Sequence, residues 1–150
     1  TRLGLPERLG QAVSKVFVDT AAWLALVNED DDLHTQAIQV KNKLQIDKSF
    51  LITTDFIFLE VADALATLKF RRITIAYIQR LRGWANLGVL PINEGLYNQG
   101  WQLYCQRLDK DWGLTDCISF VAMQQEGVSV AFTSDRHFEQ AGFQRLLSPA

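Results

Sequence analysis

Short apolar runs alternate along this chain with longer stretches whose apolar residues recur at helical spacing. The apolar runs rich in β-branched residues predict strands at 16–19, 50–54, 89–92 and 128–133, with a last apolar run at 143–147. The stretches between them predict helices at 20–27, 33–44, 56–69, 74–85, 95–108 and 115–126, with another beginning near residue 134. This alternation is typical of an α/β fold whose mostly parallel central sheet is covered by helices on both faces.

The pattern predicts one domain. It begins near residue 16, so residues 1–15 are interpreted as a leader or tail and residues 16–147 as the domain. The longest run without a polar side chain is the seven residues Ala21–Val27, against about 20 for a membrane span. The first eight residues include charges and a proline and lack the apolar core of a signal peptide. We therefore expect a cytoplasmic protein that has no membrane partner.

Charge and cysteine content narrow the choice of partners. The formal net charge is −2, so the chain lacks the strongly basic surface of non-specific nucleic-acid binders. Any polyanionic partner would have to be held by a local patch or through a metal ion. Cys105 and Cys117 lack C-x-x-C spacing and predict reduced, packed thiols.

Acidic residues lie where the predicted strands end. Asp19 closes the first strand, Asp135 follows Thr133 at the end of a later strand, and Asp116 opens a helix. In doubly wound sheets, ligands collect at the carboxyl ends of the strands. Asp116 could instead cap its helix, and Asp135 could cap a turn. Asp19 is harder to explain structurally, because an unpaired acid at the end of an apolar strand is expensive to bury.

Glu60 is the fourth candidate. With Asp63, Thr67 and Arg71 it follows a 3, 4, 4 spacing, which predicts one polar stripe along the helix at 56–69 and beyond. One carboxylate of that stripe could face the strand ends, although a solvated helix face explains it equally well.

Four converging carboxylates would need a counter-charge. Two like charges about 4 Å apart repel by roughly 4 kcal/mol at an effective dielectric constant of about 20. A divalent cation is the simplest compensation, and an oxygen-only ligand set favours Mg²⁺ or Mn²⁺. Zinc would require His or Cys clusters, whereas this chain has only His34, His137 and two separated cysteines.

Four segments resemble the PIN domain family of metal-dependent ribonucleases, and more narrowly its VapC-like toxins. They are Val-Phe-Val-Asp-Thr-Ala-Ala-Trp at 16–23, Phe-Leu-Glu-Val-Ala-Asp at 58–63, Trp-Gly-Leu-Thr-Asp-Cys-Ile-Ser-Phe-Val at 112–121 and Ala-Phe-Thr-Ser-Asp-Arg-His-Phe at 131–138. The resemblance covers residues 16–147 and implies a three-layer α/β/α sandwich with an acidic pocket. It leaves the leader, residues 1–15, without an assigned function.

The resemblance also implies the chemistry of the site. Asp19, Glu60, Asp116 and Asp135 take the places of the family's four acids, which hold Mg²⁺ or Mn²⁺ and hydrolyse RNA phosphodiesters through metal-activated water. Thr115 and Thr133 match positions where the family often has hydroxyl residues near the pocket, although helix capping or strand packing explains them equally well.

An RNA substrate would need cations beyond the metal. The densest basic stretch holds Lys69, Arg71, Arg72, Arg80 and Arg82, of which Arg71 and Arg72 are the main candidates for a backbone-binding rim. An ordinary solvated helix surface is the competing interpretation. His137 could likewise flank the substrate, while Phe138 is expected to pack into the core.

For a toxin, the resemblance implies a small antitoxin protein as partner and a homodimer. The alternative function is a PIN-like module that binds RNA or protein without catalytic turnover. The sequence lacks the motifs that define several other enzyme classes: it has no P-loop, no G-x-G-x-x-G and no G-x-S-x-G motif. A haloacid-dehalogenase-type phosphatase would need Asp-x-Asp after the first strand, where this chain has Asp19-Thr-Ala.

Overall fold

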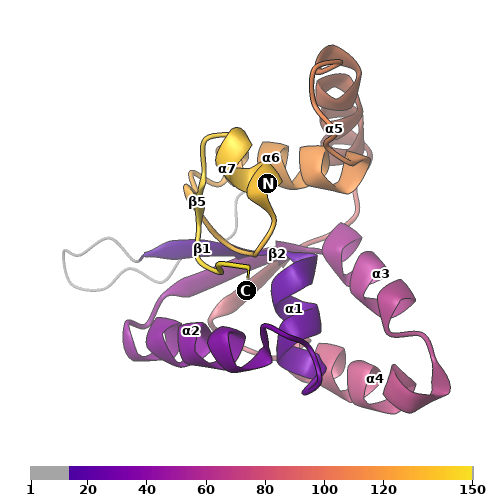
Figure 1. Cartoon of the computed structure of the whole chain (residues 1–150). Helices are drawn as coiled ribbons and strands as arrows, with labels where there is room; N and C mark the ends of the chain where they lie inside the picture. Colours follow the sequence, from indigo (N-terminus) through magenta and orange to yellow (C-terminus); the bar gives the residue numbers. More distant parts are fainter. Residues whose placement is uncertain (1–13, 150) are drawn as a thin grey trace.

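A five-stranded parallel sheet forms the middle layer of the molecule (Figure 1). The computed structural model describes residues 14–149, so nearly all of the predicted leader, residues 1–13, lies outside the described residues. The strands are β1 (Lys15–Val18), β2 (Phe50–Thr54), β3 (Leu87–Leu90), β4 (Val130–Phe132) and β5 (Gln144–Arg145). Their order is β3-β2-β1-β4-β5, and every pairing is parallel.

Seven helices make up the outer layers within the described part of the chain. They are α1 (Thr20–Val27), α2 (His34–Ile46), α3 (Asp55–Ala64), α4 (Leu68–Arg82), α5 (Glu94–Gln106), α6 (Leu114–Gln125) and α7 (Arg136–Gln140). Helices α1 to α4 cover one face of the sheet and α5 to α7 lie on the other (Figure 1). This arrangement confirms the predicted three-layer α/β/α sandwich.

The core lies on both faces of the central strands, as expected for a parallel sheet covered twice. Residues 16–18 of β1 and all five residues of β2 are buried. On the α6–α7 side, Phe120 and Phe138 meet edge to face at 4.9 Å between ring centroids. Phe138 is fully buried, as predicted, and this contact holds α7 against α6.

The predicted boundary between the helices at 56–69 and 74–85 is wrong, because the break falls at residues 65–67 rather than 70–73. Helix α3 ends at Ala64, after which Leu65 turns into the core, and α4 begins at Leu68. The carbonyl of Thr67 accepts from the backbone N–H of Arg71 and so starts the first turn of α4. Glu60 and Arg71 therefore belong to different helices, and the predicted polar stripe does not exist.

Smaller differences concern strand ends and a thiol. The third strand ends at Leu90 rather than 92, because Pro91 cannot donate to a ladder. The last apolar run yields only the two-residue β5. Both cysteines are free, but only Cys117 is buried, so the prediction of a packed thiol is wrong for exposed Cys105. Across residues 14–149, the helices are too short or too polar to traverse a bilayer.

Candidate metal centre

Asp19 lies at the carboxyl edge of the sheet, between β1 and β4. Its backbone N–H donates to the carbonyl of Phe132 at 3.1 Å, which extends the pairing of the two strands by one bond. The Thr133 hydroxyl donates to Asp19 Oδ2 at 2.7 Å, and the Asp19 residue is only 6% exposed. The end of β4 therefore fixes the carboxylate that ends β1.

Asp116 reaches the same edge from the start of α6. Its Oδ2 accepts from the backbone N–H of Gly113 at 3.1 Å, which satisfies one of the free donors at the helix N-terminus. The same oxygen lies 3.1 Å from His137 Nδ1. The capping interpretation of Asp116 is therefore correct, and it is compatible with a place in the acidic group.

Asp135 caps the short helix α7 and lies beside the other two acids. Its Oδ1 accepts from the backbone N–H of His137 at 2.9 Å, and its own N–H donates to the Thr133 hydroxyl at 3.1 Å. Thr133 thus contacts both Asp19 and Asp135, through a donated and an accepted hydrogen bond. One threonine sets the relative positions of two of the candidate acids.

Glu60 approaches from α3 on the other face of the sheet. The hydroxyl of Thr20, the first residue of α1, donates to Glu60 Oε1 at 2.6 Å. Since Thr20 follows Asp19, Glu60 lies at the margin of the acidic group. Asp63, one turn further along α3, is exposed to solvent.

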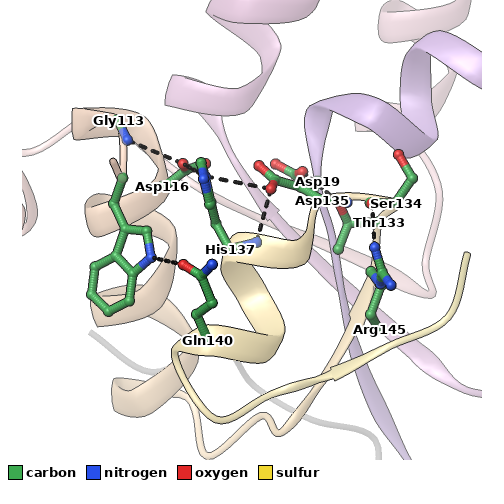
Figure 2. A network of polar contacts seen from close by, with 10 residues as sticks. Asp19, Gly113, Asp116, Thr133, Ser134, Asp135, His137, Gln140 and Arg145 are labelled. Carbon is green, nitrogen blue, oxygen red and sulfur yellow. Dashed lines mark hydrogen bonds and ion pairs between the residues drawn. The ribbon is translucent and has the colours of Figure 1, made fainter. Parts of the chain in front are cut away.

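The side chains of Asp19, Asp116 and Asp135 point toward one common space, with His137 beside them (Figure 2). One ligand atom each from Asp116, Asp135 and His137 can be chosen so that all lie within 4.8 Å of one another. The sequence pattern therefore placed three acids correctly at one edge. His137 is an addition to the group, because the sequence indicated for it only a place at the flank of a substrate.

The electrostatics of this group are unfavourable without a cation. Burial raises the pKa of Asp19 to about 7, the Thr133 hydrogen bond opposes that rise, and the charges of Asp116 and Asp135 add to it. Burial also raises the pKa of Asp116, and the contact of its carboxylate with the His137 ring opposes that rise. A divalent cation fits this set, because it would supply the missing positive charge to carboxylates that burial has stripped of water.

The remaining predicted residues lie outside this group. Thr115 is half-buried at the second position of α6, next to Asp116. Arg71 and Arg72 are exposed on α4, and Arg71 Nε donates to the carbonyl of Ala66. No sequence pattern pointed to Thr20, since its contact with Glu60 joins residues 40 positions apart.

The fold and the acidic edge define a PIN-type domain, and the sequence comparison agrees. The chain matches the PIN domain family over residues 16–144 and belongs to that family. It is 26% identical over 128 residues to the 23S rRNA-specific endonuclease VapC20 of Mycobacterium tuberculosis, in both strain CDC 1551 and strain H37Rv. That alignment covers 85% of this chain and 95% of VapC20.

Solved structures agree with this assignment. The crystal structure of M. tuberculosis VapC20, described as a sarcin-ricin loop cleaving toxin, superposes with a TM-score of 0.76 at 25% identity. It covers 89% of this chain and 99% of that structure. FitAcB from Neisseria gonorrhoeae superposes with a TM-score of 0.61 at 15% identity, over 87% of this chain and 95% of that one, and this match supports the fold alone.

Proposed function

We propose that this chain is a metal-dependent ribonuclease that hydrolyses RNA phosphodiester bonds, and that it is the toxin of a toxin–antitoxin pair. The observation that carries the proposal is the convergence of Asp19, Asp116 and Asp135 at the carboxyl edge of a PIN-type sheet. The similarity to VapC20, an rRNA endonuclease described as a toxin, supports the choice of RNA as substrate. Because the proposed substrate is RNA, we also propose that the protein acts in the cytoplasm.

The catalytic residues in this proposal are Asp19, Glu60, Asp116 and Asp135, which would hold Mg²⁺ or Mn²⁺. When bound, the ion supplies a Lewis acid for the scissile phosphate and lowers the pKa of water. Thr133 orients Asp19 by donating to Oδ2. Asp19 must lose its proton before it can act as a ligand, so metal affinity should rise with pH.

Substrate contacts outside the acidic group are proposed at Thr115, Arg71 and Arg72. Thr133 is better assigned as a positioning residue, since its hydroxyl is buried and already engaged by Asp19 and Asp135. The nuclease domain is proposed to be residues 16–147.

Two protein partners follow from the toxin proposal: a small antitoxin and a second copy of this chain. Exposed apolar side chains support a need for such partners, because large apolar surfaces on a domain mark interaction sites. On α4 these are Leu68, Ile73 and Ile75, and on α5 they are Tyr97, Trp101 and Tyr104.

The competing function is a PIN-like module that binds RNA or protein without turnover. A cleavage assay separates the two. Purified chain is incubated with a mixed cellular RNA pool in Mn²⁺, in Mg²⁺ and in EDTA, and the same reactions are run with Asp116→Asn. Asparagine keeps an oxygen that can accept from Gly113 N–H, so the variant removes the charge while preserving the helix cap.

We expect cleavage by the wild type in either metal, none in EDTA, and an activity at least about 100-fold lower in Asp116→Asn. Asp111→Asn is the matched control, because Asp111 is exposed and lies only five positions away. Cleavage that survives in EDTA, or equally in Asp116→Asn, would contradict the proposed site. Metal-dependent RNA binding without cleavage would favour the binding module.

A further inference from the structure

His137 presents a nitrogen to the acidic group. Its Nδ1 lies 3.1 Å from Asp116 Oδ2 and 3.4 Å from Asp135 Oδ1. We propose that His137 is a metal ligand in this chain and makes the centre prefer Mn²⁺ to Mg²⁺. This inference rests on the proposed function, because it requires a divalent ion at the acids.

The spacing of the three groups suits one ion. An octahedral ion with bonds of about 2.1 Å has neighbouring ligands about 3 Å apart and opposite ligands about 4.2 Å apart. The two separations at Nδ1 are close to the first value, and the three ligand atoms all lie within 4.8 Å of one another. A small movement would let Nδ1 and both carboxylates contact the same ion.

The position of the imidazole is set by the packing around it. His137 is the second residue of α7, and its backbone N–H is fixed by Asp135 Oδ1. The next residue, Phe138, is locked against Phe120 of α6, the helix that carries Asp116. Trp112 Nε1 also donates to Gln140 Oε1 at 3.0 Å and ties the end of α7 to the segment before α6. The packing of α7 against α6 in the core therefore sets the distance between His137 and Asp116.

The partners of Nδ1 distinguish His137 from the other histidine. His34 Nδ1 lies 2.7 Å from the carbonyl of Ala25, so that nitrogen must carry a proton and cannot bind a metal there. His137 Nδ1 faces two carboxylates, which are metal ligands themselves. In the neutral imidazole, Nδ1 can turn a lone pair toward an ion between those carboxylates.

A nitrogen ligand changes which ion the centre favours. Carboxylate oxygens serve both Mg²⁺ and Mn²⁺, whereas imidazole nitrogen is a ligand of transition-metal ions. Mg²⁺ keeps several of its waters and uses only one or two carboxylates. The removal of a nitrogen ligand should therefore change the affinity for Mg²⁺ little. In the alternative interpretation, the imidazole ring occupies the position of the ion and itself provides the positive charge between the carboxylates. In that case its removal would strengthen the binding of both metals.

Metal binding, measured apart from catalysis, tests the proposal. Mn²⁺ affinity is obtained from the electron paramagnetic resonance signal of the unbound ion, and Mg²⁺ affinity from its competition with Mn²⁺. In His137→Ala we expect the Mn²⁺ dissociation constant to rise about tenfold and the Mg²⁺ constant to change less than about threefold. In His137→Asn an oxygen replaces Nδ1, so Mg²⁺ binding should be retained while the preference for Mn²⁺ falls.

His34→Asn is the matched control and should bind both metals like the wild type. Melting curves in EDTA establish that each variant is folded. Unchanged or tighter Mn²⁺ binding in His137→Ala would overturn the proposal, as would an equal weakening for both metals. A wild type that binds neither ion would overturn the proposed metal-dependent function as well, whereas failure confined to the His137 variants would leave that function standing.

Discussion

Asp116 and Asp135 each serve two purposes at the residue scale. The sequence predicted either helix capping or membership of an acidic site, and the structure contains the capping contacts together with the convergence. Asp19 and Asp135 could be found from the sequence because parallel strands end at one edge, and Asp116 because it lies at the start of a predicted helix. The contacts of Thr20 with Glu60 and of His137 with Asp116 could not, since they depend on how helices pack.

Asp19 should make the metal-free protein less stable as the pH rises. Its pKa is about 7 when folded and near 3.8 when unfolded, so between these values the folded state holds a proton that the unfolded state has lost. Stability from this group is therefore fully present below about pH 4 and is lost as the pH rises to about 7. Asp19→Asn carries no charge, and Asn can still accept from Thr133.

The measurement is urea unfolding in EDTA for wild type and Asp19→Asn. We expect the advantage of Asp19→Asn over the wild type to grow by about 3 kcal/mol between about pH 5 and about pH 8. The difference between the two free energies of unfolding cancels the titration of groups that lie far from residue 19. A constant difference across this range would mean that Asp19 is already ionised when folded. Saturating Mn²⁺ should reverse the order at the higher pH, because only the wild type keeps the full ligand set.

At the scale of elements, helix periodicity alone predicted a break between α3 and α4 but placed it about five residues too late. Apolar residues continue across the junction, but their environments differ: Leu65 is 6% exposed and Leu68 is 92% exposed. An exposed leucine and a buried one look identical in a hydrophobic pattern. The break matters for function, because it separates Arg71 from the helix that carries Glu60.

Helices α5 and α6 approach closely at Gly100, and this contact can be tested. A Cβ on Gly100 would overlap the Ile118 side chain and lie 3.0 Å from its Cα. We expect Gly100→Ala to destabilise the protein by about 1–3 kcal/mol, because the backbone of α6 cannot yield without disturbing the core. Chemical unfolding in EDTA measures the change without a contribution from metal binding.

Gly95→Ala, on the same helix, is the control. Its Cβ would meet only the Asn93 side chain, at 3.5 Å, so alanine should be tolerated or stabilise by about 0.5 kcal/mol. Equal effects of the two substitutions would show that helix propensity, rather than the α5–α6 contact, decides the outcome. Since α6 carries Asp116, Gly100→Ala should also weaken metal binding, whereas Gly95→Ala should not.

At the scale of the whole molecule, the first turns of α4, which carry Lys69, Arg71 and Arg72, lie away from the acids. Lys69 pairs with Asp30 at 3.6 Å, beyond the C-terminal end of α1, whereas Asp19 precedes its N-terminal end. The eight residues of α1 therefore separate the two regions by about 12 Å. The sequence predicted the layers of the fold, but it could not give this distance, which depends on the crossing of α4 over α1.

An RNA that contacts both Arg71 or Arg72 and the acids must therefore span several nucleotides. In the double variant Arg71→Gln/Arg72→Gln, we expect the plot of log affinity against log salt concentration to become shallower by about 1.4. This corresponds to about 0.7 for each single-strand phosphate that is no longer neutralised. Binding is measured by fluorescence anisotropy with labelled RNA over a series of KCl concentrations. The Asp116→Asn background prevents cleavage during the titration, and Lys43→Gln/Lys48→Gln removes the same charge elsewhere on the surface.

The control should lower the slope much less than the arginine pair. If the two double variants behave alike, only the net charge matters and α4 is not part of the RNA path. Arg136 then becomes the stronger candidate, because it is exposed and adjoins Asp135 at the carboxyl edge of the sheet. A reduced slope in Arg136→Gln, with none in the arginine pair, would place the RNA backbone along α7 and confine recognition to the rim of the acidic group.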